Sequence, residues 1–293
     1  MMNKVLFVGV FAPNSTNVAQ ARGFEHAGCE VHTYDYRERF SKLGIVKMRD
    51  NELIKLCEEK SPNLVIFSKC NQMHHRVVDE CNKHAKTVLW YMDALNNFNT
   101  ELIEKVKRVS HFICGIDGVV PHGKEHNPNT VFLPQCPDEE MNFMLENIEY
   151  KHDATFIGNI SPQTGTHGDR LKYKTEVGFT HLEGVYGKEH NKVVNESKIN
   201  LNFAHTSTAG ASVRVFKILA SGGFLLTTPW EGMEELFTVG EDLDTFESPQ
   251  ELREKIDFYL NNEQKRDEIR LNGHKTVQKF MPTNWAQSIL SIV

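Results

Sequence analysis

The sequence lacks the signatures of several common enzyme classes. It contains neither GxGxxG nor GxxxxGK[ST], and GxSxG and HExxH are also missing. The first two patterns hold phosphates in dinucleotide-binding and P-loop proteins. Their absence therefore disfavours a nicotinamide-dependent dehydrogenase, a P-loop enzyme and a nucleotide-sugar epimerase.

Cysteines and long apolar runs are also scarce. None of the six cysteines follows Cys136, and no CxxC pair occurs. This distribution argues against a disulfide framework and indicates reduced thiols, so we expect a cytoplasmic protein, in the host cytoplasm if a phage encodes it. No apolar run approaches the roughly 20 residues that span a bilayer. The short apolar stretch at residues 5–10 contains a glycine and predicts a buried strand rather than a signal peptide.

The chain has no excess of positive charge. Its 33 basic and 39 acidic residues give a formal net charge of −6, with a pI near 6.2. Proteins whose main task is to coat nucleic acid are usually strongly basic, so that class is disfavoured. With 293 residues, of which 40% are hydrophobic, the composition is that of a globular protein of about two domains.

Strands and helices alternate through the first half of the chain. Strands are predicted at residues 5–10, 30–34, 64–67, 87–92, 111–114 and 131–134, and helices at 19–27, 51–60, 74–85 and 101–109. Repeated βα alternation predicts a parallel sheet with helices on both faces. Ligands of such sheets bind at the carboxyl ends of the strands. These ends are expected at residues 11–17, 35, 68–71, 93–97, 115–117 and 135.

A second α/β unit is predicted after a polar hinge at residues 138–152. Its strands are predicted at 154–157, 198–203 and 224–228, and its helices at 213–221, 249–260, 263–280 with an interruption at Gly273, and 285–292. Ser248 and Glu251 form a capping-box pattern at the start of one of these helices. We therefore expect an α/β protein with two similar halves.

The segment 210–223 is the most informative candidate site. Ser212 is a plausible N-cap, so the free backbone N–H groups and the positive end of the helix dipole would face an anion. One helix face is shared by Arg214, Lys217, Ile218 and Ser221. Two cations in the first turns interact unfavourably with the positive end of the helix dipole. The negative charge of a bound diphosphate would offset this interaction. A solvated basic face is the alternative interpretation.

Two further candidates follow predicted strands. Gly158 and Asn159 come directly after one strand, and a glycine there lets a ligand approach the backbone closely. An ordinary βα turn is the alternative at that place. Asp93 ends another strand, where a carboxylate would suit a ligand-binding cleft, and the alternative is a cap for the next helix.

Three groups of residues resemble metal sites only weakly. Asp242 and Asp244 form a DxD pattern, for which turn and surface roles are predicted. His122 and His126 are four residues apart, but a nearby glycine and proline predict a loop. A partly exposed helix face, rather than a zinc site of common spacing, is predicted for His74, His75, Cys81 and His84. The sequence therefore predicts no metal site.

Residues 214–228 resemble the signature of CgeB-like glycosyltransferases. The similarity continues at residues 234–237, 240–241, 248–252, 259–262 and 266–273, and upstream at 90–93, 133–135, 156–159 and 198–203. This resemblance implies an α/β fold of GT-B architecture, in which two Rossmann-like, doubly wound domains face a cleft. It implies an acceptor domain at residues 1–150, a nucleotide-sugar donor domain at 151–275, and a last helix at 276–293 that crosses back to the first domain.

The resemblance also implies roles for individual residues. The implied catalytic residues are Asp93, Arg214 and Lys217. Donor binding is implied for Gly158, Asn159, Arg170, Asn202, His205, Ser212, Arg214, Lys217 and Ser221, and acceptor binding for Asn14, Ser15, Thr16 and Asp93. Two positions depart from the family pattern. Lys217 stands where relatives carry a Glu that binds the donor ribose, and Ala209 where retaining relatives carry a Glu that contacts the sugar.

The implied activity is transfer of a hexosyl or pentosyl group from a nucleotide-sugar, in the first place a UDP-sugar. It would need no metal and no other cofactor, and it would retain the configuration of the sugar. Two acceptors are considered, a hydroxymethylated base in phage DNA and a surface glycan. For DNA, the expected basic rim consists of Arg170, Lys172, Lys174, Lys188 and Lys192. A catalytically inactive binding or structural protein of the same fold is the alternative, motivated by Lys217 and Ala209.

Overall fold

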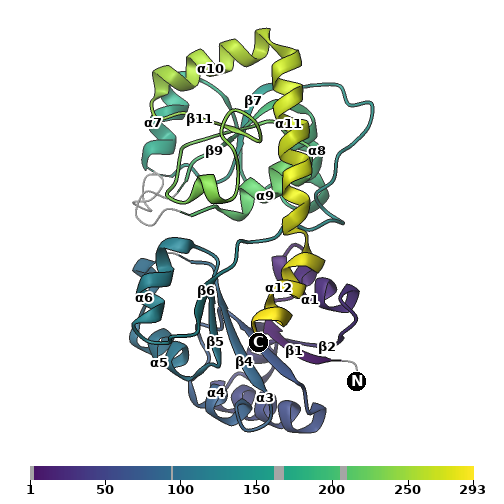
Figure 1. Ribbon diagram of the computed structural model, residues 1–293, viewed down its shortest axis with the longest axis vertical. Coiled ribbons are helices and arrows are strands. Elements are labelled where there is room, and N and C mark those ends of the chain that lie inside the picture. The colour runs from purple at the N-terminus through teal and green to yellow at the C-terminus, as the bar shows by residue number, and fades with distance from the viewer. Residues whose placement is uncertain (1–2, 94, 162–167, 205–209) are drawn as a thin grey trace. The chain divides into compact units, whose positions relative to one another are not determined.

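The computed structural model describes residues 3–93, 95–161, 168–204 and 210–293. The chain divides into two compact units. Unit 1 comprises Met1–Gln135 and Pro282–Val293, and unit 2 comprises Cys136–Met281. Each unit contains one parallel sheet with helices packed against it (Figure 1). The predicted α/β class is therefore confirmed.

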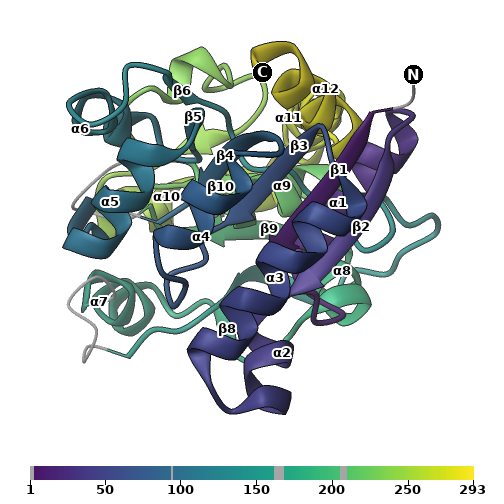
Figure 2. The same cartoon turned by 90° about the horizontal axis from the view of Figure 1, so that it is seen from below.

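The sheet of unit 1 has the strand order β2-β1-β3-β4-β5-β6 (Figure 2). Its strands are β1 Lys4–Gly9, β2 Glu30–Asp35, β3 Leu64–Ser68, β4 Lys86–Tyr91, β5 His111–Cys114 and β6 Thr130–Phe132. All five residues of β3 are buried, because a strand covered on both faces has no side open to solvent. This burial explains why the central strands are recognisable in the sequence as continuous apolar runs.

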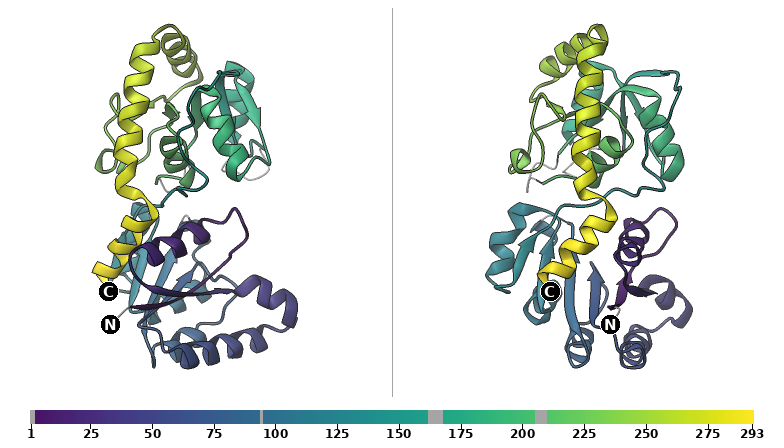
Figure 3. Two further views of the ribbon diagram at one scale, coloured as in Figure 1. Left: turned by 90° about the vertical axis from the view of Figure 1, so that its right-hand side faces the viewer. Right: turned by 45° about the vertical axis from the view of Figure 1, so that its right-hand side comes forward.

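Helices cover both faces of this sheet. One face carries α3 Val46–Lys60, α4 Arg76–Cys81 and α5 Thr100–Arg108, whose apolar residues form a common core with the strands. The other face carries α1 Thr16–His26 and α12 Pro282–Ile292. Figure 3 shows that α12 lies beside α1, although the two helices come from opposite ends of the chain.

The contact between α1 and α12 depends on a glycine. A Cβ at Gly23 would lie only 2.2 Å from the carbonyl oxygen of Pro282. Further along α12, Trp285 packs edge-on against Phe24 and Trp90, with ring centroids 6.0 and 5.2 Å apart. Aromatic pairs of this geometry add about 0.5–1.5 kcal/mol beyond the area that they bury. The last helix is therefore part of the core of unit 1.

The sheet of unit 2 has the strand order β11-β10-β9-β7-β8. Its strands are β7 His152–Ile157, β8 Thr180–Leu182, β9 Ser197–Asn202, β10 Leu225–Thr227 and β11 Asp244–Thr245. Its helices are α7 Gly168–Val177, α8 Gly187–Asn195, α9 Val213–Ala220, α10 Pro249–Asn261 and α11 Glu263–Val277. Side chains of α7, α10 and α11 pack on the sheet face that carries Phe156 and Phe203.

Both sheets are wound in the same order. The second strand of each unit lies on one side of the first strand, and the third and later strands lie on the other side. The strand order therefore reverses between β1 and β3 in unit 1 and between β7 and β9 in unit 2. Ligands of open α/β sheets bind outside the carboxyl ends of the strands at such a switch point. Ligand sites are thus expected at the ends of these four strands.

Several details differ from the sequence prediction. The prediction omitted α7, β8 and α8, as well as α2 Tyr36–Leu43 and α6 Val120–Lys124. The predicted interruption at Gly273 is wrong, because α11 continues through it. A Cβ at this glycine would lie 2.1 Å from the carbonyl oxygen of Asp242, so close packing explains the residue. Half of the predicted capping box is confirmed, since the Ser248 hydroxyl accepts from the Glu251 N–H at 3.1 Å, but the Glu251 carboxylate accepts from the Glu247 N–H rather than from that of Ser248.

The segment that precedes β7 is packed onto α8. The side-chain oxygens of Asn191 and Asn195 accept hydrogen bonds from the backbone N–H groups of Phe143 and Leu145, at 3.0 and 2.9 Å. The six cysteines are buried and none is in a disulfide. Among the described residues, no helix combines the length and the apolar character that crossing a membrane requires.

Candidate functional site

Arg214 connects the ends of β7 and β9 at the switch point of unit 2. It is the second residue of α9, and its Nε donates to the carbonyl oxygen of Ile157 at 2.9 Å. Its Nη1 donates to Oδ1 of Asn202, also at 2.9 Å. The guanidinium lies over the ring of Phe156, 4.9 Å from the centroid. These contacts leave Arg214 partly exposed at the edge of the sheet.

Gly158 follows β7 and lies directly against this arginine. Its φ of +154° is a conformation that residues with a side chain rarely adopt. A Cβ at this position would lie 2.6 Å from Nη2 of Arg214. The next residue, Asn159, is exposed, and its side chain accepts from the Ser161 N–H at 2.6 Å. The glycine is thus required by the close approach of the guanidinium.

Arg170, from α7, approaches the same aromatic ring. Its guanidinium lies 5.4 Å from the centroid of Phe156. Nη1 donates to the carbonyl oxygen of Asn159 at 3.0 Å, and Nη2 to that of Phe203 at 3.2 Å. Its Nε is buried and has no hydrogen-bond partner. The structure thus brings two predicted donor-binding arginines to one place, although different helices supply them.

Within the described residues, no carboxylate accepts a hydrogen bond from either arginine. In the part of the chain that the structure describes, the recorded hydrogen-bond acceptors of Arg170 and Arg214 are backbone carbonyls and an amide oxygen. Burial, and to a lesser extent the charge of the nearby Arg170, lower the pKa of Arg214 to about 10. Both groups remain charged at neutral pH. Like charges held this close favour the binding of an anion.

The start of α9 has no side-chain cap. Ser212 is the N-cap residue, as predicted, but its hydroxyl makes no capping hydrogen bond. It donates instead to Oδ1 of Asn202 at 3.2 Å, and the amide nitrogen of Asn202 donates to the Thr227 hydroxyl at 2.9 Å. The backbone N–H groups of the first helical turn are therefore not occupied by this side chain. Such groups and the helix dipole are suited to bind phosphate.

Lys217 lies on the next turn of α9. Burial lowers its pKa, while the carboxylate of Asp138 raises it and the charge of Arg214 lowers it. Ser221, which was predicted to contact the donor, is buried at the other end of the helix and donates to the carbonyl oxygen of Lys217 at 2.8 Å. The predicted face of α9 therefore places Lys217, but not Ser221, near the candidate site.

A buried histidine, His190 on α8, was missed by the sequence reasoning. Burial lowers its pKa to about 3, and the charges of Lys217 and Arg214 contribute in the same direction. Its Nδ1 is buried without a hydrogen-bond partner. It is therefore neutral at physiological pH beside two cations. Nothing in the local sequence distinguishes it, because its environment depends on the packing of α8 against α9.

Some predictions for unit 2 are not met or lie outside the described residues. His205 and Ala209 fall in the segment that the structure leaves undescribed. In the expected basic rim, Arg170 is buried and the ammonium of Lys174 bonds to the carbonyl oxygen of Phe179. The remaining members, Lys172, Lys188 and Lys192, are exposed. The rim as a whole therefore does not form a free basic surface.

In unit 1, Asp93 forms an ion pair at the carboxyl edge of the sheet. Its Oδ1 lies 2.5 Å from Nζ of Lys69, and both side chains are about a third exposed or less. Lys69 follows β3, and Asp93 follows the neighbouring β4. The next helix, α5, is capped by Asn99, whose side chain accepts from the Leu102 N–H. Asp93 is therefore not the cap of α5.

The other predicted acceptor residues follow β1. Asn14 is exposed in the loop after this strand. Ser15 is the N-cap of α1 and accepts from the Asn17 N–H at 3.3 Å, and Thr16 is the first residue of that helix. All three lie near the switch point of unit 1, since β1 and β3 are neighbours there. The structure therefore places them at the same sheet edge as Lys69 and Asp93.

The aspartates of the DxD pattern have structural roles inside unit 2. Asp242 accepts from the Thr276 hydroxyl at 2.8 Å, and Asp244 accepts from the Tyr259 hydroxyl at 2.7 Å. Both aspartates are buried, so the predicted surface role is wrong. Their oxygens are engaged by the protein itself.

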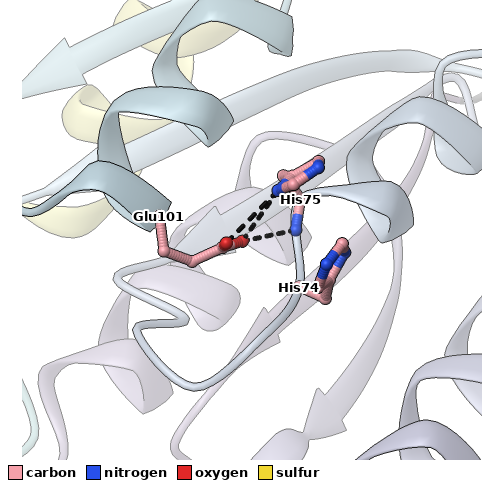
Figure 4. Close-up of side chains that lie close together, drawn as sticks. All are labelled: His74, His75 and Glu101. Atoms are coloured by element: carbon pink, nitrogen blue, oxygen red, sulfur yellow. Dashed lines mark hydrogen bonds and ion pairs between the residues drawn. The ribbon is translucent and has the colours of Figure 1, made fainter.

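Two groups of metal-ligand side chains occur in the described residues. They are His74, His75 and Glu101, and His122, Glu125 and His126. In the first group, Glu101 accepts a hydrogen bond from the His75 N–H at 2.6 Å and lies 3.2 Å from its ring Nδ1 (Figure 4). This carboxylate therefore already has a partner in the loop after β3.

Comparisons with known proteins agree with this architecture. The family model described as Glycosyl transferase-like matches residues 139–291, just over half of the chain. A search of curated proteins finds no match. Among solved structures, HepE from Anabaena in complex with UDP-glucose is 11% identical with a TM-score of 0.68, covering 98% of both chains. Sucrose-phosphate synthase from Thermosynechococcus elongatus is 10% identical with a TM-score of 0.64, covering 99% of this chain and 97% of that one.

A glycosyltransferase from Rickettsia africae is similar to the same degree. It is 10% identical with a TM-score of 0.66, and the alignment covers 99% of this chain and 97% of that one. At such identities the structures establish the fold alone, whereas the family model rests on the sequence. The chain therefore belongs to the glycosyl transferase-like family and has the GT-B fold.

Proposed function

We propose that this protein transfers a sugar from a UDP-sugar to a hydroxyl group of an acceptor, with the donor bound by unit 2. The observation that carries the proposal is the cationic site at the β7/β9 switch point. Arg170 and Arg214 meet there over one aromatic ring, beside the uncapped start of α9, and no carboxylate of the described residues accepts a hydrogen bond from either arginine. A nucleotide diphosphate supplies the negative charge that this arrangement lacks.

Each side chain of the site has a role in this proposal. Arg214 presents its remaining guanidinium edge to the diphosphate, and Arg170 adds a second positive charge. Asn202 and Ser212 hold the guanidinium in place, while Gly158 leaves room for it. Because cations and helix N–H groups neutralise the leaving group, the reaction needs no metal ion. The UDP-glucose complex of HepE supports UDP as the nucleotide.

The transfer step exchanges one bond of the anomeric carbon for another. The acceptor oxygen bonds to the anomeric carbon while the bond between this carbon and the β-phosphate oxygen breaks. The electron pair of the broken bond leaves with UDP. The proton of the acceptor hydroxyl passes to the departing phosphate, and the configuration is retained. Lys217, near Arg214, stabilises the charge that develops on the phosphate.

The acceptor is assigned to unit 1. Asp93 and the loop of Asn14, Ser15 and Thr16 lie at the carboxyl edge of its sheet, where α/β proteins bind ligands. The two acceptor classes are a hydroxymethylated base in phage DNA and a surface glycan. A test of salt-dependent binding to modified duplex separates them, because only contacts to DNA phosphates weaken steeply as salt rises.

The proposal is tested by thermal stabilisation with a panel of nucleotide sugars. UDP-glucose, UDP-galactose and UDP-N-acetylglucosamine are compared with the GDP- and ADP-glucose analogues. A cognate donor at about 100 times its Kd stabilises the folded chain by roughly 2.7 kcal/mol. A melting temperature that no nucleotide sugar raises would contradict the proposal.

A non-catalytic protein that only binds a nucleotide sugar is the second candidate. It is favoured by Lys217, which stands where related enzymes carry a ribose-binding Glu. The two functions differ in the release of UDP from a bound donor when water is the only acceptor. Release by the wild-type chain, and not by Arg214→Ala, supports the enzyme, whereas binding without any release supports the alternative.

A further inference from the structure

The chain makes a strained bend directly after β3, at the switch point of unit 1. Lys69 and Cys70 are consecutive residues with φ of +58° and +50°. Residues with a side chain rarely occupy this left-handed region, because their Cβ lies too close to the following carbonyl oxygen there. Such strain persists only where the surrounding structure enforces it, and it concentrates at functional sites.

The side chain that this bend presents is paired across the sheet edge. The ammonium of Lys69 lies 2.5 Å from Oδ1 of Asp93. Both side chains are partly exposed, and an ion pair this accessible contributes little to stability. The pair therefore does not offset the strain of the bend.

Two buried cations donate hydrogen bonds to carbonyl oxygens of the bend and of the loop that follows it. Lys105 of α5 is 1% exposed, and its Nζ donates to the carbonyl oxygens of Cys70 at 2.7 Å and Met73 at 3.1 Å. Arg49 of α3 is 0% exposed, and its Nη2 donates to the carbonyl oxygen of Gln72 at 2.8 Å. Burying a charge is costly unless hydrogen bonds compensate it, so these bonds strongly define the loop.

Carboxylates of the same two helices hold the end of the loop. Oε1 of Glu101 accepts from the His75 N–H at 2.6 Å, and Figure 4 shows this carboxylate reaching from α5 to the loop. Oδ2 of Asp50, on α3, lies 3.5 Å from the His74 nitrogen. The loop from Lys69 to His75 is therefore held at its carbonyl groups by cations and at its N–H groups by anions.

We propose that Lys69 and Asp93 act together on the acceptor hydroxyl, and that Lys105 is the positioning residue for this pair. Lys69 fixes one carboxylate oxygen, and the carboxylate accepts a hydrogen bond from the acceptor hydroxyl when the acceptor binds, which orients the acceptor oxygen. The proton leaves this hydrogen bond for the departing phosphate when the acceptor oxygen bonds to the anomeric carbon. The bonds made and broken are those of the transfer described above. This inference rests on the proposed function and adds two residues, Lys69 and Lys105, to its acceptor site.

The first experiment measures positioning without any activity. In Lys105→Met, the carbonyl groups of the loop lose their donor, so amide hydrogen exchange at residues 69–75 rises about tenfold or more. Lys107→Met is the matched control, since Lys107 is on the same helix and pairs with Glu104 at the surface. Amine acetylation followed by mass spectrometry reports on Lys69 itself, which reacts faster in Lys105→Met and in Asp93→Ala than in the wild type.

The second experiment measures UDP release from the UDP-sugar that stabilises the wild type best, with water as acceptor. Lys69→Met and Asp93→Ala each lower the rate at saturating donor by about tenfold or more, while the Kd for UDP stays within about twofold. The double variant is no more than about twofold slower than the slower single variant, because the residues act as a unit. Lys83→Met, which changes an exposed lysine of unit 1, keeps the wild-type rate.

The outcomes separate this inference from the proposed function. Wild-type rates in Lys69→Met overturn the inference, and so does a Lys105→Met chain whose loop exchanges faster while UDP release is unchanged. If Lys105→Met does not fold, Lys69→Met tests the inference by itself, because the Lys69 side chain is partly exposed and its loss leaves the core intact. A wild-type chain that neither binds nor cleaves a UDP-sugar contradicts the proposed function. In that case unchanged loop exchange or Lys69 acetylation in Lys105→Met still overturns the positioning role.

Discussion

Gly158 lies so close to Arg214 that a Cβ at this position would be 2.6 Å from Nη2 of the arginine. The two residues come from different parts of the sequence and meet where β7 ends beside α9. The backbone of one and the guanidinium of the other together form the wall of the candidate donor site. Changes at either residue therefore test the same site in different ways.

Replacement of Arg214 by alanine is expected to weaken UDP binding by about tenfold or more, which corresponds to about 1.4 kcal/mol. Arg214→Lys keeps the charge but loses the planar fork, so it restores only part of the affinity. Stability in urea should change little, because removal of the charge also relieves repulsion from Arg170. Isothermal titration with UDP measures the effect. Arg253→Ala, at the surface of unit 2, is the control, and equal affinities of the two alanine variants would refute the role.

Gly158→Ala is expected to disturb the donor site through its new methyl group. The matched control is Gly178→Ala, where φ is also positive at +85° but nothing lies within 4 Å of the added Cβ. Both variants carry backbone strain of about 1–2 kcal/mol. Only Gly158→Ala pushes on Arg214, so only this variant should lose affinity for UDP. Similar UDP affinities after both substitutions would show that the close approach has no functional importance.

Gly273→Ala is expected to destabilise the protein although alanine favours helices. The gain in helix propensity is about 1 kcal/mol, but the added Cβ would lie 2.1 Å from the carbonyl oxygen of Asp242. Overpacking of this kind costs typically 1–3 kcal/mol, so a net loss is expected in urea unfolding. The neighbouring Asn272 is exposed, and Asn272→Ala should be neutral or stabilising. A more stable Gly273→Ala protein would contradict the packing described for α11.

His190 is expected to make the stability depend on acid. Its pKa is about 3 in the folded protein, below the ordinary value of 6.5, because of burial and the nearby charges of Lys217 and Arg214. The unfolded chain therefore binds a proton that the folded chain excludes, and stability falls as the pH drops from 6.5 towards 3. The slope is about 1.4 kcal/mol per pH unit within this window.

Urea unfolding between pH 7 and pH 4 measures this contribution. His190→Asn should have a smaller loss of stability on acidification than the wild type, whereas His84→Asn, which changes an exposed histidine, should follow the wild type. The difference between wild type and variant in the loss of unfolding free energy gives the contribution of His190, because the carboxylates that also titrate are the same in both proteins. Identical pH dependence of wild type and His190→Asn would show that His190 is not buried beside the two cations.

Much of the architecture was predictable because burial leaves a local signal. The strands β1 and β3 are apolar at almost every position, since helices cover both faces of their sheet. The helices α7 and α8 gave a weaker signal, because many of their residues are polar and exposed. The sequence indicates an interruption at Gly273 because it does not distinguish a glycine required by close packing from a glycine that ends a helix.

The candidate site was predictable only in part. Arg214 and Gly158 were recognised separately, from the start of a helix and the end of a strand. The ion pair of Lys69 with Asp93 was not foreseen, because the two residues follow different strands and no periodicity relates them. Ser221 shares a helix face with Arg214 and Lys217, but it lies at the other end of α9, away from the site.

The sequence by itself determined the buried strands, most of the helices, the α/β class and the likeness to a family, because these depend on local periodicity and short motifs. Only the tertiary structure decided which strands became neighbours, and hence that Arg170 and Arg214 share the ring of Phe156. The same winding placed Lys69 beside Asp93. Charge and close approach act through space, so their effects depend on the order of strands in the sheet rather than along the chain.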